Sequence, residues 1–247
     1  MTIDAFFSRT AILLNPEELT ALTQKHILIA GIGGVGGFVA EALGRAGVQE
    51  LTLLDYDTVS PSNLNRQLIA LHSTLGQKKT IVMAERLRDI NPDIRLNLKT
   101  EFLQKEQADT LIKQGNYDFV VDCIDSIACK AALIAACMHH DVPVASSMGA
   151  GNRLDVTQVK VKTLNQTKNC ALARELRKQL KILQVRTNYP VVYSEELARQ
   201  PLPHQPIDSE IEGRPRAVNG TISYMPALFG LMLTGVVVEK LIQQSST

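Results

Sequence analysis

Residues 26–47 read HILIAGIGGVGGFVAEALGRAG, and this stretch decides the fold. Its first five residues form an apolar run of the kind found in the central strand of a parallel sheet. Gly31, Gly33 and Gly36 then follow in the order G-x-G-x-x-G, with Gly34 between them. Backbone N–H groups in such a loop can approach a phosphate at a helix N-terminus, where the helix dipole favours negative charge. The stretch therefore predicts a nucleotide site between a strand and a helix.

Strand and helix patterns alternate along the residues that flank this stretch. Strands are predicted at 26–30, 51–54, 119–124 and 142–146, and helices at 16–25, 38–46, 77–90 and 130–140. After residue 150 the pattern changes to a half-exposed strand at 156–163, a basic helix at 171–183, a loop at 199–216 and an apolar helix at 224–238. The alternation predicts an α/β fold: a Rossmann-like, doubly wound, mainly parallel sheet with helices on both faces. A smaller C-terminal extension of mixed strands and helices would complete it.

The length of 247 residues suits one domain, with a nucleotide-binding core at about 20–150 and a substrate-side portion at about 151–247. The formal charge of +1 gives no global attraction to nucleic acid or membrane. The four cysteines form no C-x-x-C pair, which argues against a zinc ribbon and favours a reducing cytoplasm. Residues 224–238 are uncharged but shorter than the roughly 20 residues of a membrane span, so a buried helix is expected and no stable membrane insertion. Contact of these residues with a membrane stays open.

Asp55 ends the second strand, where a carboxylate can accept both hydroxyls of a nucleotide ribose. Up to this point the pattern fits a dehydrogenase equally well. The next segment, DYDTVSPSNLNRQ from Asp55 to Gln67, adds Asn63 and Arg66, and GQKK at 76–79, which opens the following helix, adds Lys79. Cations beside the glycine loop suit an ATP triphosphate whose pyrophosphate leaves, as adenylation requires. The full ATP-binding set expected is Gly31, Gly33, Gly34, Gly36, Asp55, Asp57, Asn63, Arg66, Gln67 and Lys79.

The strand FVVDCID carries Asp122 and Asp125 near its carboxyl end, where side chains of a parallel sheet face the ligand crevice. A carboxylate there can hold Mg²⁺ that bridges the phosphates. Asp125 is the preferred ligand, Asp122 a weaker one, and capping of the following helix by Asp125 is the structural alternative.

Together, GIGGVGG, DYDTVSPSNLNRQ, GQKK and DCIDS resemble the adenylation domain of the ubiquitin-activating-enzyme superfamily. The resemblance covers about residues 6–150. It implies that Asp55 binds the ATP ribose, that Asn63, Arg66 and Lys79 bind the phosphates, and that Asp125 organises Mg²⁺. It also implies a homodimer, because Arg9 matches the arginine that reaches in trans to the partner's γ-phosphate. The catalytic residues implied are Arg9, Arg66, Lys79 and Asp125.

The second half, with SSMGAGN, TKNCALAR and VVYSEE, resembles the tRNA threonylcarbamoyladenosine dehydratase branch, although Ala171 stands where that branch often has Pro. The resemblance implies an AMP-forming, ligase- or cyclase-type tRNA-modifying enzyme. It would adenylate the threonine carboxylate of threonylcarbamoyladenosine next to the anticodon, release pyrophosphate, and close a ring as AMP leaves. The alternative is an adenylyltransferase that activates the C-terminal glycine of a ubiquitin-like sulfur carrier. A sulfur-relay partner and a monovalent cation (Na⁺ or K⁺) stay open.

Cationic residues cluster between positions 160 and 186 in a chain of almost no net charge. This cluster, the basic patch, predicts contact with a phosphate backbone, against the alternative of a solvated helix face. The expected tRNA contacts are Lys160, Lys162, Lys168, Arg174, Arg177, Lys178 and Lys181. Met148, Gly149, Gly151 and Asn152 are expected in a loop on the substrate side. Cys170 is expected to be structural, since an intramolecular nucleophile needs no enzyme thiol.

Overall fold

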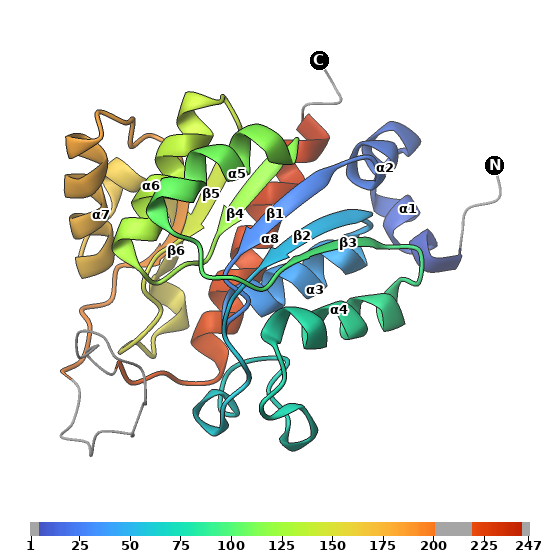
Figure 1. Ribbon diagram of the computed structural model, residues 1–247, viewed down its shortest axis with the longest axis horizontal. Helices are drawn as coiled ribbons and strands as arrows, with labels where there is room; N and C mark the ends of the chain where they lie inside the picture. Colours follow the sequence, from blue (N-terminus) through green and yellow to red (C-terminus); the bar gives the residue numbers. More distant parts are fainter. Residues whose placement is uncertain (1–4, 201–218, 244–247) are drawn as a thin grey trace.

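The computed structural model describes residues 5–200 and 219–243 (Figure 1). In these residues one seven-stranded sheet has the order β3-β2-β1-β4-β5-β7-β6. The strands are β1 (His26–Ala30), β2 (Glu50–Leu54), β3 (Arg95–Lys99), β4 (Phe119–Asp122), β5 (Val144–Ser147), β6 (Val159–Thr163) and β7 (Pro190–Ser194). Neighbouring strands are parallel, except that β6 runs antiparallel to β7. This is the mainly parallel sheet that the sequence predicts.

Helices cover both faces of the sheet (Figure 1). The α-helices are α1 (Thr10–Leu13), α2 (Pro16–Thr23), α3 (Gly36–Ala46), α4 (Lys79–Ile90), α5 (Ala108–Gly115), α6 (Ile127–His139), α7 (Ala171–Ile182) and α8 (Tyr224–Gln243). Short 3₁₀ turns are η1 (Ala5–Phe7), η2 (Pro61–Asn63), η3 (His72–Thr74), η4 (Lys105–Gln107), η5 (Val156–Gln158) and η6 (Leu164–Gln166). Helices α3, α4 and α8 share one apolar core, and α5, α6 and α7 share the other.

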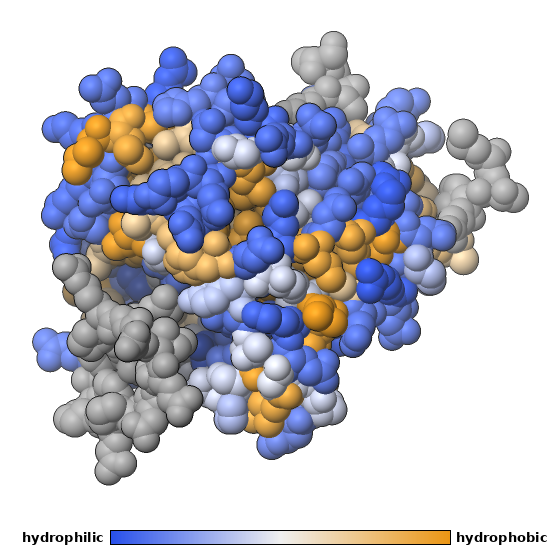
Figure 2. Space-filling model, in the orientation of Figure 1, coloured by the Kyte–Doolittle hydropathy of each residue, from blue (hydrophilic) through white to orange (hydrophobic). Residues whose placement is uncertain are grey.

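The apolar run of β1 supplies both cores, because successive side chains of a strand point to opposite faces. Ile27 and Ile29 are fully buried against the α3 and α8 side, and Leu28 and Ala30 against the α5 and α6 side. The doubly wound arrangement is thereby confirmed. Apolar side chains also reach the surface: on the face in Figure 2 they gather in separate patches among hydrophilic ones.

Several elements differ from those predicted. The strand expected at 119–124 ends at Asp122, and the strand expected at 156–163 begins at Val159, after a 3₁₀ turn. The sequence pattern predicts neither strand β3 nor helix α5, and the VVYS segment, which carries a family motif, forms β7. Of the loop expected at 199–216, all but the first two residues lie outside the described part of the chain.

Helix α8 is the one described helix that is long and apolar enough to cross a membrane by length and composition. Met225, Phe229, Leu233 and Val237 on it are nevertheless fully buried in the core that α8 shares with α3. A side chain on Gly230 would lie 2.6 Å from the carbonyl oxygen of Val35, so the two backbones pack closely here. The helix expected at 224–238 is therefore a core helix, and it continues to Gln243.

Candidate nucleotide-binding site

A pocket of about 390 Å³ opens where the strands β1, β2 and β4 end, at the carboxyl edge of the sheet. The segment between β2 and α4 projects beyond this edge at the bottom of Figure 1. Residues expected at the ATP site that line the pocket are Gly31, Gly33, Gly34, Asp55, Asp57, Asn63, Arg66, Gln67, Lys79 and Asp125. These residues span 95 positions of the sequence, from Gly31 to Asp125. The fold brings them together at the topological switch point, which is where open α/β sheets bind ligands.

The glycine loop connects β1 to α3 in a path that side chains would block. Gly31 has a φ of +91°, and a Cβ on it would lie 2.8 Å from the carbonyl oxygen of Cys123. A Cβ on Gly36 would lie 1.7 Å from the carbonyl oxygen of Gly31. Gly36 does not line the pocket, so its part is to pack the first turn of α3 against the loop. No described side chain caps α3, whose N-terminal N–H groups are therefore not taken by a cap.

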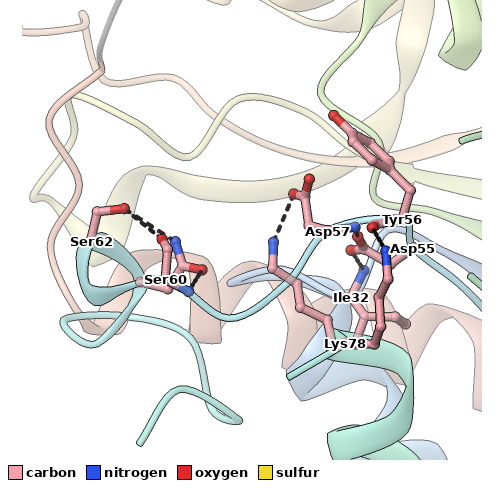
Figure 3. Close-up of polar contacts among 9 residues, drawn as sticks. Ile32, Asp55, Tyr56, Asp57, Ser60, Ser62 and Lys78 are labelled. Carbon is pink, nitrogen blue, oxygen red and sulfur yellow. Dashed lines mark hydrogen bonds and ion pairs between the residues drawn. The ribbon is translucent and has the colours of Figure 1, made fainter. Parts of the chain in front are cut away.

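Two backbone N–H groups bind the carboxylate of Asp55. Its Oδ2 accepts a hydrogen bond of 2.6 Å from the N–H of Ile32, and its Oδ1 accepts one of 2.9 Å from the N–H of Asp57 (Figure 3). Burial raises the pKa of the Asp55 carboxyl, although the charge of Lys79 and the two N–H groups act in the opposite direction. The carboxylate thus joins the glycine loop to the segment that follows β2.

Lys79 and Arg66 bring positive charge to the pocket from the segment after β2. Lys79 is 5% exposed, and its Nζ lies 2.9 Å from Oδ2 of Asp57. The guanidinium of Arg66 donates to the carbonyl oxygen of Ser62 at 2.8 Å and to Oδ1 of Asn65 at 2.9 Å. Burial lowers the pKa of Arg66. Two cations held by the fold on one side of a glycine loop suit a polyphosphate.

Two buried amides lie beside these cations. Asn63, which lines the pocket, accepts a hydrogen bond through Oδ1 from the N–H of Ser60 and donates one of 3.5 Å through Nδ2 to Oγ of Ser62. Oε1 of Gln67 is buried and has no hydrogen-bond partner among the described residues. Because a buried oxygen without a partner is costly, a hydrogen-bond donor of a bound ligand is its natural partner. Together, the two cations and these amides suit a ligand that carries both anionic groups and hydroxyl or amino donors, as ATP does.

The segment after β4 forms the opposite wall, where Cys123, Ile124, Asp125 and Ser126 line the pocket. Asp122 does not line it: this carboxylate is fully buried and lies 2.7 Å from Nζ of Lys130. The interpretation of Asp122 as a weaker Mg²⁺ ligand is therefore wrong, because its oxygens face the core. Burial and the charge of Asp122 raise the pKa of the Cys123 thiol, so this cysteine is no thiolate nucleophile.

Oxygen ligands for Mg²⁺ are few. No group of three or more His, Cys, Asp and Glu side chains that could hold a metal ion occurs in the described ranges. Mg²⁺ commonly binds through one or two carboxylates, with substrate phosphates and water as the other ligands. The donor set therefore fits Mg²⁺ that enters with ATP at Asp125, and not a metal bound by protein alone.

The loop after β5 reaches the pocket at Gly151 but not at Met148, Gly149 or Asn152. Met148 is buried, and Asn152 donates from Nδ2 to Oδ1 of Asn219 at 3.0 Å. These residues thus form the frame of the loop rather than its pocket-facing side.

Arg153 organises this loop, a role that no sequence pattern predicts. Its guanidinium is buried and donates to the carbonyl oxygens of Gly149, Gly151 and Asn169. The substrate-side loop is thereby tied to the residue just before Cys170, which is buried at the N-cap of α7.

The basic patch lies on β6, α7 and the segment between them. Lys160, Lys162, Lys168, Arg174, Lys178 and Lys181 are exposed. Arg177 is turned inward, since its guanidinium donates to the carbonyl oxygen of Leu164 and to Oγ1 of Thr167. Two lysines form surface ion pairs, Lys162 with Glu195 and Lys178 with Glu175. Cationic side chains nevertheless remain in excess on this surface.

Arg9 is exposed at the start of α1 and does not line the pocket of its own chain.

Comparison with known proteins agrees with this geometry. The profile of the ThiF family matches residues 7–247. The chain belongs to the ThiF family. Among its relatives, the tRNA threonylcarbamoyladenosine dehydratase of Haemophilus influenzae is 41% identical over 169 residues, which cover 68% of this chain and only 64% of that enzyme. The dehydratase of Bacillus subtilis is 33% identical over 241 residues and covers 96% of this chain and 94% of that enzyme.

A solved structure shows the same architecture for this ThiF-family chain. The crystal structure of E. coli tRNA N6-threonylcarbamoyladenosine dehydratase, TcdA, in complex with AMP has a TM-score of 0.87 and 33% sequence identity. The superposition covers 100% of this chain and 98% of that one. The chain therefore has the same α/β fold as that dehydratase.

Proposed function

We propose that this ThiF-family chain is an ATP-dependent enzyme that dehydrates threonylcarbamoyladenosine in tRNA. The observation that carries the proposal is the similarity to dehydratases over nearly the whole chain, including the half that follows the nucleotide core. The crevice supports it, because it joins a ribose acceptor, two cations and a carboxylate around a glycine loop. In this proposal residues 20–150 bind ATP, and residues 151–247 serve the tRNA side of one domain.

Each group in the crevice has a part in adenylation. Asp55 accepts hydrogen bonds from the ribose hydroxyls, while Asn63, Arg66 and Lys79 bind the phosphates. Since negative charge develops on the departing pyrophosphate, these cations act most strongly in the transition state. Asp125 holds Mg²⁺, which supplies further charge neutralisation at the phosphates when it is bound. For Na⁺ or K⁺ we assign no ligands.

The reaction balances in two steps. First, an oxygen of the threonine carboxylate attacks the α-phosphorus of ATP, the bond to the β-phosphate breaks, and pyrophosphate leaves. Second, a nucleophilic atom of the ureido group attacks the activated carbonyl carbon, the bond from that carbon to the AMP oxygen breaks, and the ureido proton is released. The nucleoside loses one water equivalent, whose oxygen leaves in AMP.

The tRNA would lie along the basic patch, through Lys160, Lys162, Lys168, Arg174, Lys178 and Lys181. Arg177 supports this surface from within instead of contacting RNA. The loop of Met148, Gly149, Gly151 and Asn152 would lie between the patch and the crevice, with Gly151 at the pocket. We place the enzyme in the cytoplasm with its tRNA substrate.

We also propose a homodimer in which Arg9 reaches the ATP of the partner subunit. On α1, next to Arg9, Ile12 is 78% exposed and Leu13 is 83% exposed. Apolar side chains this exposed suit a protein interface. A sulfur-relay protein would be a separate partner.

The test is AMP release from the purified chain with ATP and Mg²⁺, with tRNA that carries threonylcarbamoyladenosine or with tRNA that lacks threonylcarbamoyl. Release that requires the modified tRNA supports the dehydratase. Release that instead requires a carrier protein with a C-terminal diglycine would move the chain to the sulfur-carrier adenylyltransferases.

A further inference from the structure

A fully buried ion pair lies beneath the wall of the crevice, between β4 and α6. Asp122 ends β4, and Lys130 lies in the first turn of α6. Nζ of Lys130 is 2.7 Å from Oδ2 of Asp122, and both side chains are 0% exposed. Neither residue lines the pocket, so the proposed reaction gives them no direct contact with ATP.

Stability does not explain the pair. Burying two charges carries a desolvation cost of several kcal/mol per ion, and apolar residues of similar size are often as stable or more stable. The other bonds of the pair indicate what it holds. Oδ1 of Asp122 accepts from the N–H of Ile124 at 3.1 Å, and Nζ of Lys130 donates to the carbonyl oxygen of Ile124 at 2.9 Å.

Ile124 is thus gripped at both of its backbone polar groups, directly before Asp125. On the other side, the N–H of Cys123 donates to the carbonyl oxygen of Ala30 at 2.8 Å, and the carbonyl of Cys123 lies against Gly31. The segment from Cys123 to Asp125 is therefore fixed by β1 at its start and by the ion pair at its centre. Little backbone freedom is left at Asp125.

We propose that Asp122 and Lys130 are positioning residues, which fix the backbone of Ile124 so that the Asp125 carboxylate meets Mg²⁺ and the ATP phosphates. This inference rests on the proposed function, in which Asp125 is the Mg²⁺ ligand. Mutation of a residue that orients a metal ligand typically lowers metal affinity or activity by about 10–100-fold. The pair acts through Asp125, and so it should affect the binding of Mg²⁺ with ATP more than the binding of ATP alone.

The test is the double variant Asp122→Leu/Lys130→Met, which fills the same space with apolar side chains. Its dissociation constants for ATP are measured by calorimetry in Mg²⁺ and in EDTA, together with kcat, KM and the thermal midpoint. The matched control is Asp118→Leu/Lys25→Met, which removes the ion pair of 3.0 Å at the opposite ends of β1 and β4. We expect the first variant to unfold near the wild-type midpoint, to bind metal-free ATP normally, and to lose about 10–100-fold of both Mg²⁺-dependent affinity and kcat. The control should show the same difference in ATP affinity between Mg²⁺ and EDTA as the wild type.

The inference would be overturned if the folded double variant showed the same difference in ATP affinity between Mg²⁺ and EDTA as the wild type. It would also be overturned if Mg²⁺ did not change the ATP affinity of the wild type. If the double variant does not fold, Asp122→Asn/Lys130→Met replaces it, because this form keeps the acceptor for the N–H of Ile124. In this variant Mg²⁺ should raise the ATP affinity less than in the wild type. An increase as large as that of the wild type would again refute the positioning role. A normal Mg²⁺ effect in the wild type without tRNA-dependent AMP release would refute only the proposed substrate.

Discussion

Replacing Gly36 by alanine should damage both stability and ATP binding, because the first turn of α3 has no room for a methyl group. The added Cβ would lie 1.7 Å from the carbonyl oxygen of Gly31, whereas real Cβ contacts are essentially never shorter than 3.0 Å. The loop must therefore move by at least the difference, 3.0 − 1.7 = 1.3 Å. Overpacking of this kind costs about 1–3 kcal/mol. About 0.5–1 kcal/mol of this cost is offset, because alanine destabilises a helix less than glycine does.

The displaced loop forms one wall of the pocket, through Gly31 and Gly33. A misplacement of about 1 Å can lower the rate of a positioned reaction by about 10²-fold. Urea unfolding gives the free energy of unfolding of the Gly36→Ala variant, and calorimetry gives its affinity for ATP. The matched control is Gly235→Ala in α8, where an added Cβ meets nothing within 4 Å.

The control should raise the free energy of unfolding by about 0.5–1 kcal/mol and leave ATP binding unchanged. Gly36→Ala should lower the free energy of unfolding by about 1 kcal/mol or more and weaken ATP binding at least tenfold. If Gly36→Ala and Gly235→Ala behaved alike in both assays, the close packing of the glycine loop would not be what shapes the pocket.

Three further predictions concern charge. Arg66→Ala and Asp125→Ala should each reduce AMP formation by about 10²–10³-fold with an unchanged circular dichroism spectrum, and near-normal turnover of either folded variant would contradict the site assignment. Lys178→Glu should lower the slope of log affinity for tRNA against log salt by about one, whereas Lys113→Glu, the same change on α5, should leave the slope unchanged; equal slopes for both would remove the basic patch from the account. Adenosine binding should weaken as the pH falls, from a higher pH than an ordinary aspartate would give, because the pKa of Asp55 is raised and only its ionised form accepts both ribose hydroxyls. Asp55→Asn should bind adenosine weakly and without this pH dependence, and a wild-type affinity that stays constant into the acid range would contradict the role of Asp55.

The sequence predicted the parts of the fold whose signals are local. An apolar run, three spaced glycines and Asp55 at the end of the next strand specify the nucleotide core within about 30 residues, and the structure places them as expected. Strand β3 was missed, since its alternating RLNLK pattern with exposed charges lies at the sheet edge and does not look like a buried parallel strand.

Residues whose roles depend on distant partners could not be predicted. Lys130 looks like a misplaced charge in an apolar helix until β4 brings Asp122 beside it. Arg153 is buried because it meets the carbonyl groups of two separate segments. Arg177 counts as one more cation of the basic patch in the sequence, but the turn at Thr167 binds it from inside. In these three cases the role of the residue depends on where its side chain points in the folded chain, which the residue type alone does not reveal.

Isotope transfer gives the sharpest test of whether the threonine carboxylate is adenylated. The substrate is tRNA whose threonylcarbamoyladenosine carries ¹⁸O in both carboxylate oxygens, incubated with the enzyme, ATP and Mg²⁺. We expect AMP that contains one ¹⁸O atom in its phosphate and a nucleoside that has lost one labelled oxygen and two hydrogens. Unlabelled AMP, or labelled AMP beside a nucleoside of unchanged hydrogen and oxygen count, would overturn this mechanism.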